Sequence, residues 1–444
     1  MFEAGLIVIF LGVTLLLSHK QWKSIYTKYT KSTPVATEDQ EKKEKNSSIY
    51  GNDEPLPRPT PLMITPEQVE NYDDRPWRPF RWPYHQTMSI YKLDINHWLD
   101  MDKYYIHYYN EKQRIRLKYG KENFASLPEG MESCVELMEV VVDHLVARYP
   151  LLFTVLQDDE TDWTKGKIIR NEITKETLDM TLPLKEHPLV YVSKLAKEDF
   201  YFAKKNPEDG LHYLVAAGVA FPGGSFDVSA KLGKHLDQIH EEVPYYREKL
   251  RTSMERWFNR MKPNEPVERA SWYISWDTQL RVNNIYQIPK FKPNLEADMK
   301  STSPKQFNVR VERQTLRMLP KTKTIIFTNH PTFYSIEEMK DEPMIPSLIK
   351  KIMFEAQEKI IKYKNFEFIR DHLADYLDGL IQRQKDLGII TDETPLKTQK
   401  SYPFAHWVKT DFDYVNGWNN PSPSYSKEHR LTESFNKDNL ADNE

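Results

Sequence analysis

Residues Asn308–Thr328 read NVRVERQTLRMLPKTKTIIFT and carry the clearest fold signal in the chain. Apolar and β-branched side chains recur in both halves, which predicts strands over Asn308–Met318 and Thr324–Thr328. The five residues between them, Leu319–Lys323, include a proline and are typical of a hairpin connection. Because strands joined by a hairpin run antiparallel, we expect an antiparallel sheet.

On either side of this hairpin, further elements follow from the spacing of apolar residues and from the positions of Pro and Gly. The predicted strands are Leu189–Leu195, Leu211–Phe221 and Ser271–Trp276, and the predicted helices are Met131–Tyr149, Ser229–His240, Tyr246–Met261 and Ile345–Leu387. Strands joined by short turns, with helices between others, predict an α+β fold. Cys134 lies on the first of these helices and is expected in the core.

The strand Asn308–Met318 is unusual because it carries charge on both faces. Alternation places Arg310, Glu312 and Gln314 on one face and Arg313 on the other. A buried charge needs a partner, so this pattern indicates an edge strand, an internal ion-pair network or the wall of an anion-binding pocket. The sequence leaves these alternatives open.

A second unusual segment runs from Phe221-Pro222-Gly223-Gly224-Ser225 into a helix that ends near His240. Pro and Gly permit a tight turn and a close approach of the backbone to a flat ligand, although a plain strand-to-helix connection uses the same residues. A neutral His240 could ligate a metal through a ring nitrogen, or it could cap the helix.

Composition excludes several functions. The net charge is −3, with acidic and basic residues interspersed, so nucleic acid is not an expected partner. Cys134 is the only cysteine, which excludes an internal disulfide, a CxxC zinc site and an iron–sulfur cluster held by this chain. No strand precedes a GxGxxG or GxxxxGK[ST] fingerprint, so a dinucleotide or P-loop site is not supported.

The N-terminus differs from the rest of the chain. Ala4–Leu17 is an uninterrupted apolar run followed by lysines, which predicts a membrane anchor over residues 1–20, a single N-terminal transmembrane helix with a cytosolic domain behind it. A lumenal or cleaved form is the alternative. Residues 21–70 are rich in charge and proline and are expected to form a disordered linker, and residues 396–444 an irregular tail. The endoplasmic reticulum or another internal membrane is the expected location.

Five ordered blocks between Arg78 and Ile390 resemble the haem-dependent oxidative N-demethylase family, alpha-subunit-like. They are RPFRWPYHQTMSIYKLDINHWLDMDKYY (Arg78–Tyr105), EHPLVYVSKLAKEDF (Glu186–Phe200), AAGVAFPGG with KLGKHLDQIHEEVP (Ala216–Pro244), ERASWYIS (Glu268–Ser275) and RVERQTLRMLPKTKTIIFT (Arg310–Thr328). The resemblance assigns residues 71–395 to one domain of this kind.

The resemblance implies a PAS-like antiparallel sheet with flanking helices that holds haem b and demethylates a small amine by oxidation. Such chemistry needs O₂ and electrons from a separate reductase or ferredoxin. His240 is then the expected iron ligand, and the expected cofactor-binding residues are Lys231, Arg310 and Arg313, for haem propionates or for ion pairs around them. Glu312 is the expected catalytic residue, facing an ammonium substrate or the arginines.

The alternative to an enzyme is a PAS-like sensor that binds haem or another small molecule without turnover. A structural protein that has lost haem is a third possibility. Ala220, Phe226 and Ser271 stand where the family resemblance leads us to expect Cys, Trp and Asn, which predicts a substrate pocket unlike that of other members.

Overall fold

The computed structural model describes residues 56–157, 162–223, 227–281 and 295–406. The predicted anchor, most of the linker and the tail beyond residue 406 lie outside these residues. Within the described part of the chain, no helix combines the length and the apolar character needed to cross a bilayer. The anchor over Ala4–Leu17 and its topology therefore stay predictions.

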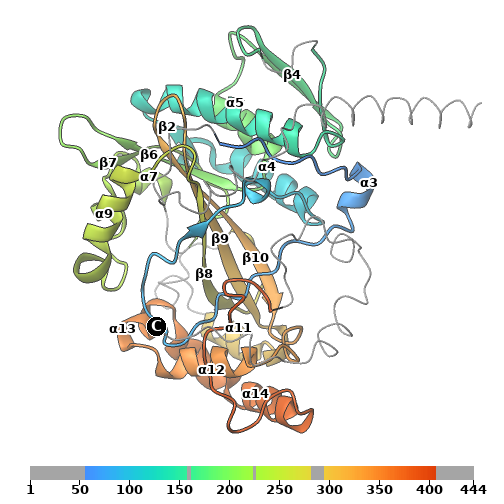
Figure 1. Ribbon diagram of the computed structural model, residues 1–444, viewed down its shortest axis with the longest axis vertical. Helices are drawn as coiled ribbons and strands as arrows, with labels where there is room; N and C mark the ends of the chain where they lie inside the picture. The colour runs from blue at the N-terminus through green and yellow to red at the C-terminus, as the bar shows by residue number, and fades with distance from the viewer. Residues whose placement is uncertain (1–55, 158–161, 224–226, 282–294, 407–444) are drawn as a thin grey trace, which may run out of the picture. The chain divides into compact units, whose positions relative to one another are not determined.

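The centre of the fold is a seven-stranded sheet in which every neighbouring pair of strands is antiparallel (Figure 1). In spatial order its strands are β1 (Tyr91–Lys92), β8 (Val267–Ser275), β9 (Asn308–Met318), β10 (Ile325–Ser335), β6 (Asp199–Lys205), β7 (His212–Gly218) and β2 (Phe124–Ser126). The predicted hairpin is confirmed as β9–β10, and the α+β class is confirmed with it. A smaller sheet contains β3 (Phe153–Val155), β4 (Gly166–Asn171) and β5 (Glu176–Thr181).

Strand register divides the charged residues of β9 between the two faces of the large sheet. Glu312 pairs with Ser271 and Pro331, whereas Arg313 pairs with Ala270 and His330. Because directly paired residues project from the same face, one face carries Glu312 with its neighbours and the other carries Arg313 with its neighbours. We call these the Glu312 face and the Arg313 face.

Helices cover both faces of the sheet. Helices α5 (Met131–Arg148) and α6 (Pro188–Leu195) pack with β6 and β7 residues of the Arg313 face. A second core contains Val309 and Val311 together with residues of α12 (Ile345–Glu355), α13 (Glu358–Tyr363) and α14 (Phe366–Asp386). Figure 1 shows these two groups at opposite ends of the long strands. The turn η4 (Tyr246–Leu250) and helix α9 (Arg251–Arg260) pack against Leu316 on the Glu312 face.

The remaining helical elements are short, apart from α4 (Tyr105–Tyr119). They are α3 (Pro66–Val69), η1 (Ile95–His97), η2 (Gly120–Glu122), η3 (Pro128–Gly130), α7 (Val228–Lys231), α8 (Leu236–Ile239), α11 (Leu295–Ser301) and η6 (Pro304–Gln306). Cys134 is buried on α5, as predicted.

Two predicted elements are wrong. Leu189–Leu195 is the helix α6 and not a strand, because Pro188 occupies its first turn and the His187 side chain accepts a hydrogen bond from the Leu189 N–H. The predicted helix Ser229–His240 is interrupted, because Gly233 adopts a left-handed conformation with φ of 81° and separates α7 from α8.

The domain extends beyond the predicted boundaries at both ends. Ile64 and Val69, expected in the linker, are buried in the core, and the Leu62 N–H donates to the Arg148 carbonyl oxygen at 2.6 Å. At the other end Ala405 is buried, and the Gln399 amide donates to the Pro343 carbonyl oxygen at 2.8 Å. Residues 56–70 and 396–406 therefore pack onto the domain.

Candidate functional site

A cavity of about 290 Å³ lies against the Glu312 face of the sheet. This volume is at the lower end of the roughly 300–1,000 Å³ found for small-molecule and cofactor sites. Residues of β6, β8, β9 and β10 line it on one side, α8, η4 and α9 on another, and residues 79–90 on a third. Much of the lining is apolar and includes Leu236, Ile239, Met254, Phe258, Leu316 and Phe327.

His240 lines this cavity from the C-terminal end of helix α8. Its Nδ1 lies 2.8 Å from the Leu236 carbonyl oxygen. Because a carbonyl oxygen can only accept, Nδ1 carries the proton and Nε2 keeps its lone pair. Among the residues that the structure describes, Nε2 has no hydrogen-bond partner. The ring stacks on Tyr246 with centroids 5.2 Å apart and planes inclined by 17°, which fixes its orientation.

The electrostatic environment keeps His240 neutral. Burial, together with the positive charges of Lys231 and Arg269, lowers the pKa of His240 to about 4, although the hydrogen bond to the Leu236 carbonyl oxygen opposes this shift. A neutral imidazole whose Nδ1 is held by a backbone carbonyl is the form that ligates a transition metal through Nε2.

Glu312 is fixed in the sheet beside the cavity by three side chains. Its Oε1 accepts hydrogen bonds from the Tyr273 hydroxyl at 2.9 Å and from Arg310 Nε at 2.7 Å, and its Oε2 accepts one from Asn329 Nδ2 at 2.6 Å. A Cβ added to Gly223 would lie 3.5 Å from this carboxyl group, so the predicted Pro-Gly turn packs directly against Glu312. The result is a rigid, buried carboxylate that lines the cavity.

Three further cations line the cavity: Arg81, Arg269 and Lys364. Lys364 is buried, and its Nζ donates to the Trp272 carbonyl oxygen at 2.6 Å. Burial, followed by the charges of Arg269 and Arg81, lowers the pKa of Lys364 to about 7. Within the described parts of the chain, none of the three forms an ion pair with Asp or Glu.

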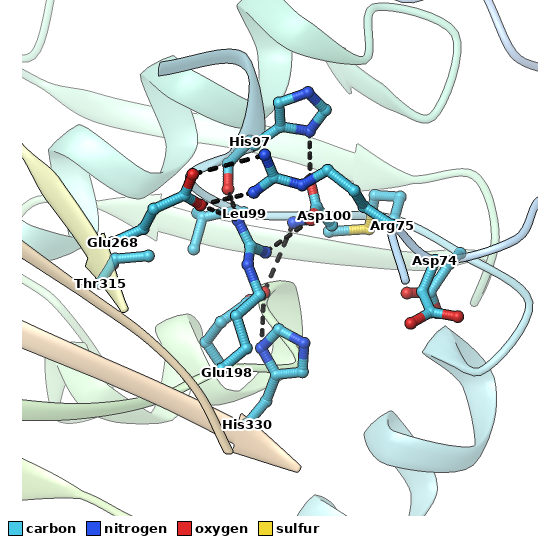
Figure 2. A network of polar contacts seen from close by, with 12 residues as sticks. Asp74, Arg75, His97, Leu99, Asp100, Glu198, Glu268, Thr315 and His330 are labelled. Atoms are coloured by element: carbon cyan, nitrogen blue, oxygen red, sulfur yellow. Dashed lines mark hydrogen bonds and ion pairs between the residues drawn. The ribbon is translucent and has the colours of Figure 1, made fainter. Parts of the chain in front are cut away.

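The Arg313 face carries a different set of charged groups, which Figure 2 shows around Glu268 and Asp100. Arg313 Nη1 lies 2.5 Å from Asp100 Oδ2, and Arg75 Nη2 lies 2.5 Å from Glu268 Oε2. His97 Nδ1 lies 3.4 Å from Asp100 Oδ1. Although burial alone would raise it, the Arg313 guanidinium holds the pKa of Asp100 well below its usual range. These charges are paired with one another inside the protein.

The same network continues to Glu198 and His330, which lie beside each other in Figure 2. His330 Nδ1 is 3.5 Å from Glu198 Oε1. Burial raises the pKa of Glu198 to about 7 and lowers that of His330 well below its usual value. The imidazole is therefore neutral at pH 7, and the two groups do not form a strong ion pair.

The structure brings some of the predicted site residues together and separates others. His240, Glu312 and Lys231 line one cavity. Arg310 lies behind Glu312, where it also donates to the Gln279 carbonyl oxygen at 2.7 Å. Arg313 projects from the opposite face and belongs to the Asp100 network.

The residues at which the sequence departs from the family pattern also differ in position. Ser271 lines the cavity, whereas Ala220 lies in a separate core cluster with Phe221. Phe226 lies outside the described residues. Of these departures, Ser271 is the one that changes the cavity wall.

Sequence reasoning missed Arg81, Arg269, Lys364 and Asn329. Arg81 and Arg269 lie within sequence blocks that carry the family resemblance, but Arg269 precedes the predicted strand Ser271–Trp276, whereas the observed strand β8 begins at Val267. Lys364 follows a helix, and nothing in its local sequence marks it.

An α+β domain with an apolar cavity, a neutral histidine and a fixed carboxylate has the arrangement of a cofactor-binding enzyme domain. Residues 89–374 match the family model for haem-dependent oxidative N-demethylase, alpha subunit-like. The chain therefore belongs to the haem-dependent oxidative N-demethylase alpha-subunit-like family.

The residues that line the cavity fit haem. His240 offers an oriented, neutral nitrogen, the apolar side chains suit a macrocycle, and the unpaired cations suit its carboxylates. Among the described residues, no group of three or more His, Cys, Asp or Glu side chains is arranged to hold a metal ion. Haem would not require such a group, because one histidine can be its only protein ligand.

Proposed function

We propose that the chain is a haem-dependent monooxygenase that removes a methyl group from a small methylated amine. In the overall reaction R₂N–CH₃, O₂, two electrons and two protons give R₂NH, formaldehyde and water. The C–H bond of the methyl group is oxidised, the C–N bond then breaks, and the second oxygen atom leaves as water. The electrons come from a separate reductase or ferredoxin, because Cys134 is the chain's only cysteine.

The observation that carries this proposal is the presence of His240 and Glu312 in one cavity. Bound haem b would supply the activation of O₂ and the one-electron chemistry that no side chain provides. His240 would hold the iron through Nε2, while its Nδ1–H bond to the Leu236 carbonyl oxygen fixes the ring and increases its basicity.

Glu312 orients the substrate. Hydrogen bonds from Tyr273, Arg310 and Asn329 hold its carboxylate in place, and the carboxylate attracts a protonated amine and accepts a charge-assisted hydrogen bond from its N–H. The surrounding apolar side chains exclude water and accommodate methyl groups. This combination favours a small alkylammonium ion over a large or anionic substrate.

The remaining parts of the proposal concern location. The apolar segment Ala4–Leu17 anchors the chain in the endoplasmic reticulum or another internal membrane, with the described domain in the cytosol. Tethering to a membrane would raise the effective concentration of a membrane-bound reductase.

The test uses the full-length chain loaded with haem, reduced chemically under O₂ in the presence of methylamine, dimethylamine or trimethylamine. We expect formaldehyde in proportion to the amine consumed, and a loss of at least tenfold in kcat/KM for Glu312→Gln. The exposed variant Glu132→Gln on helix α5 is the control and should retain full activity. Haem binding without formaldehyde from any amine would refute the enzyme and favour a haem-binding sensor.

A further inference from the structure

We propose that Arg81, Arg269 and Lys364 form a subsite for the two carboxylates of a porphyrin bound in the cavity. The inference rests on the proposed function in taking a porphyrin as the ligand. It assigns the carboxylates to residues other than Arg310 and Arg313, which already have partners inside the protein.

First, the charges of the three cations are poorly compensated within the protein: the Glu312 carboxylate raises the pKa of Lys364 by less than Arg269 or Arg81 lowers it. The three cations come from separate parts of the chain: Arg81 precedes β1, Arg269 lies on β8 and Lys364 follows α13. The groups with the largest electrostatic effect on Arg269, after burial, are Tyr402, Tyr84, Arg81 and Tyr363, none of which is a carboxylate. Placing several cations together away from water is unfavourable unless an anion joins them.

The second argument is an unused donor. Arg269 Nε is buried and has no hydrogen-bond partner among the described residues. Arg75 Nε and Arg313 Nε on the Arg313 face also have no partner in the described residues, but each of those guanidinium groups faces a carboxylate, whereas Arg269 does not. A guanidinium group presents its donors in a planar fork that matches a carboxylate, so a ligand carboxylate would satisfy both the charge and the hydrogen bonds of Arg269.

The third argument is the relation to His240. His240 and Arg269 line the same cavity. A porphyrin presents a central metal to a histidine and two carboxylates at one edge. A single porphyrin therefore accounts for both His240 and the cations that line the same cavity.

On the Arg313 face of the sheet, the cations have a structural role. Arg75 and Arg313 are each within 2.5 Å of a carboxylate oxygen, from Glu268 and Asp100 respectively. Arg81, Arg269 and Lys364 have no such partner in the described residues, although they are equally part of the folded domain. The difference points to a ligand as their counter-ion.

The test compares two metal-free ligands on the ligand-free, full-length chain: protoporphyrin with free carboxylates and its dimethyl ester. Quenching of protein fluorescence gives both dissociation constants. We expect the free acid to bind about 10- to 100-fold more tightly than the ester, which corresponds to one or two charge-assisted hydrogen bonds. Because neither ligand contains iron, the outcome does not depend on ligation by His240 or on turnover.

Substitutions of the three cations then test which residues cause the preference for the free acid. Arg269→Gln, Arg81→Gln and Lys364→Met should each reduce the preference for the acid over the ester, while the exposed control Arg256→Gln on α9 should leave it unchanged. Arg81 is half-buried, so its substitution keeps the test informative if a change at Lys364 prevents folding.

Three outcomes would overturn the assignment. One is equal binding of acid and ester by the wild-type protein, and another is an acid preference that survives all three substitutions. The third is an unchanged preference combined with weaker binding of N-methylglycine to the haem-loaded variants, which would assign the cations to a substrate carboxylate. Absence of formaldehyde in the turnover assay would refute the proposed enzyme without affecting this subsite.

Discussion

The two faces of the central sheet use charge in different ways, although strand β9 supplies both. On the Arg313 face, Arg313 and Arg75 are paired with Asp100 and Glu268. On the Glu312 face, Glu312 is held by three donors at the edge of a cavity where Arg81, Arg269 and Lys364 form no ion pair with Asp or Glu in the described residues. In the first arrangement each of these cations faces a carboxylate of the protein, whereas in the second we propose a ligand as the counter-ion.

A strand with charge on both faces can therefore have a different role on each face. An ion-pair network and an anion-binding wall were alternatives at the level of sequence, and the structure contains a network on one face and a ligand cavity on the other. A cation that has a carboxylate partner stabilises the fold, whereas a cation without one is available to bind an anionic ligand.

The largest effect on stability is expected from Arg313→Met. The substitution removes the cation that faces Asp100 and leaves that carboxylate buried without its strongest partner, which should reduce the free energy of unfolding by about 3–5 kcal/mol. Urea unfolding of the ligand-free protein measures the change. The porphyrin acid-to-ester preference of the protein that still folds should be unaltered. A loss of stability under 1 kcal/mol would contradict the structural role of this face.

Lys364→Met is the matching change on the Glu312 face and should have the opposite sign. Because the buried ammonium has no acidic partner in the described residues, its removal should leave stability unchanged or raise it by on the order of 1 kcal/mol at pH 6. The lost hydrogen bond to the Trp272 carbonyl oxygen offsets part of the gain. A loss of 2 kcal/mol or more in the same urea assay would show that Lys364 serves the fold.

The pH dependence of stability should also differ between the faces. Burial raises the pKa of Glu198 to about 7 from 4.5, so the folded state binds more protons between these values. Its contribution is greatest below pH 4.5 and is lost as the pH rises to 7, by on the order of 2 kcal/mol. Glu198→Gln should remove this part of the slope in unfolding experiments from pH 5 to 7. An unchanged slope would exclude Glu198 as its source.

Lys364 should make the free energy of unfolding rise with pH, in a higher pH range than Glu198. Its pKa falls to about 7 from 10.5 in the folded state, so the unfolded state binds more protons between these values. Stability therefore rises with pH from 7 towards 10.5 in the ligand-free protein, and Lys364→Met should flatten this rise. Bound porphyrin should flatten it as well, because a carboxylate beside Lys364 restores its charge.

The smallest effect is expected from Ser271→Asn, which alters the cavity wall without breaking any hydrogen bond found for Ser271. Stability should change by less than about 0.5–1 kcal/mol, while the ratio of kcat/KM values for dimethylamine and trimethylamine should shift by several-fold, up to about tenfold. Equal ratios in the two proteins would show that Ser271 does not contact the substrate.

Local sequence was sufficient for much of the fold. The hairpin over Asn308–Thr328 and the helix Met131–Tyr149 were predicted because their periodicity and their turn residues agree. Leu189–Leu195 was not, since its β-branched residues favour a strand and the helix depends on the cap formed by His187 and Pro188. The buried positions of Ile64 and Val69 depend on contacts with distant residues, which no local pattern reveals.

The site was only partly predictable for the same reason. His240, Glu312 and Lys231 were found from motif position and the resemblance, and they share the cavity. Arg269 and Lys364 are 95 positions apart by number and meet only through the fold. Which cations have a carboxylate partner is likewise a property of the three-dimensional structure.

Titration of the ligand-free full-length chain with haemin tests whether haem binds in the cavity at the Glu312 face with His240 as its ligand. The wild-type protein and the exposed control His107→Ala should both develop one saturable Soret band of a histidine-ligated haem, and His240→Ala should lose or shift that band. An identical Soret band in His240→Ala, or no saturable haem binding by the wild-type protein, would contradict the account.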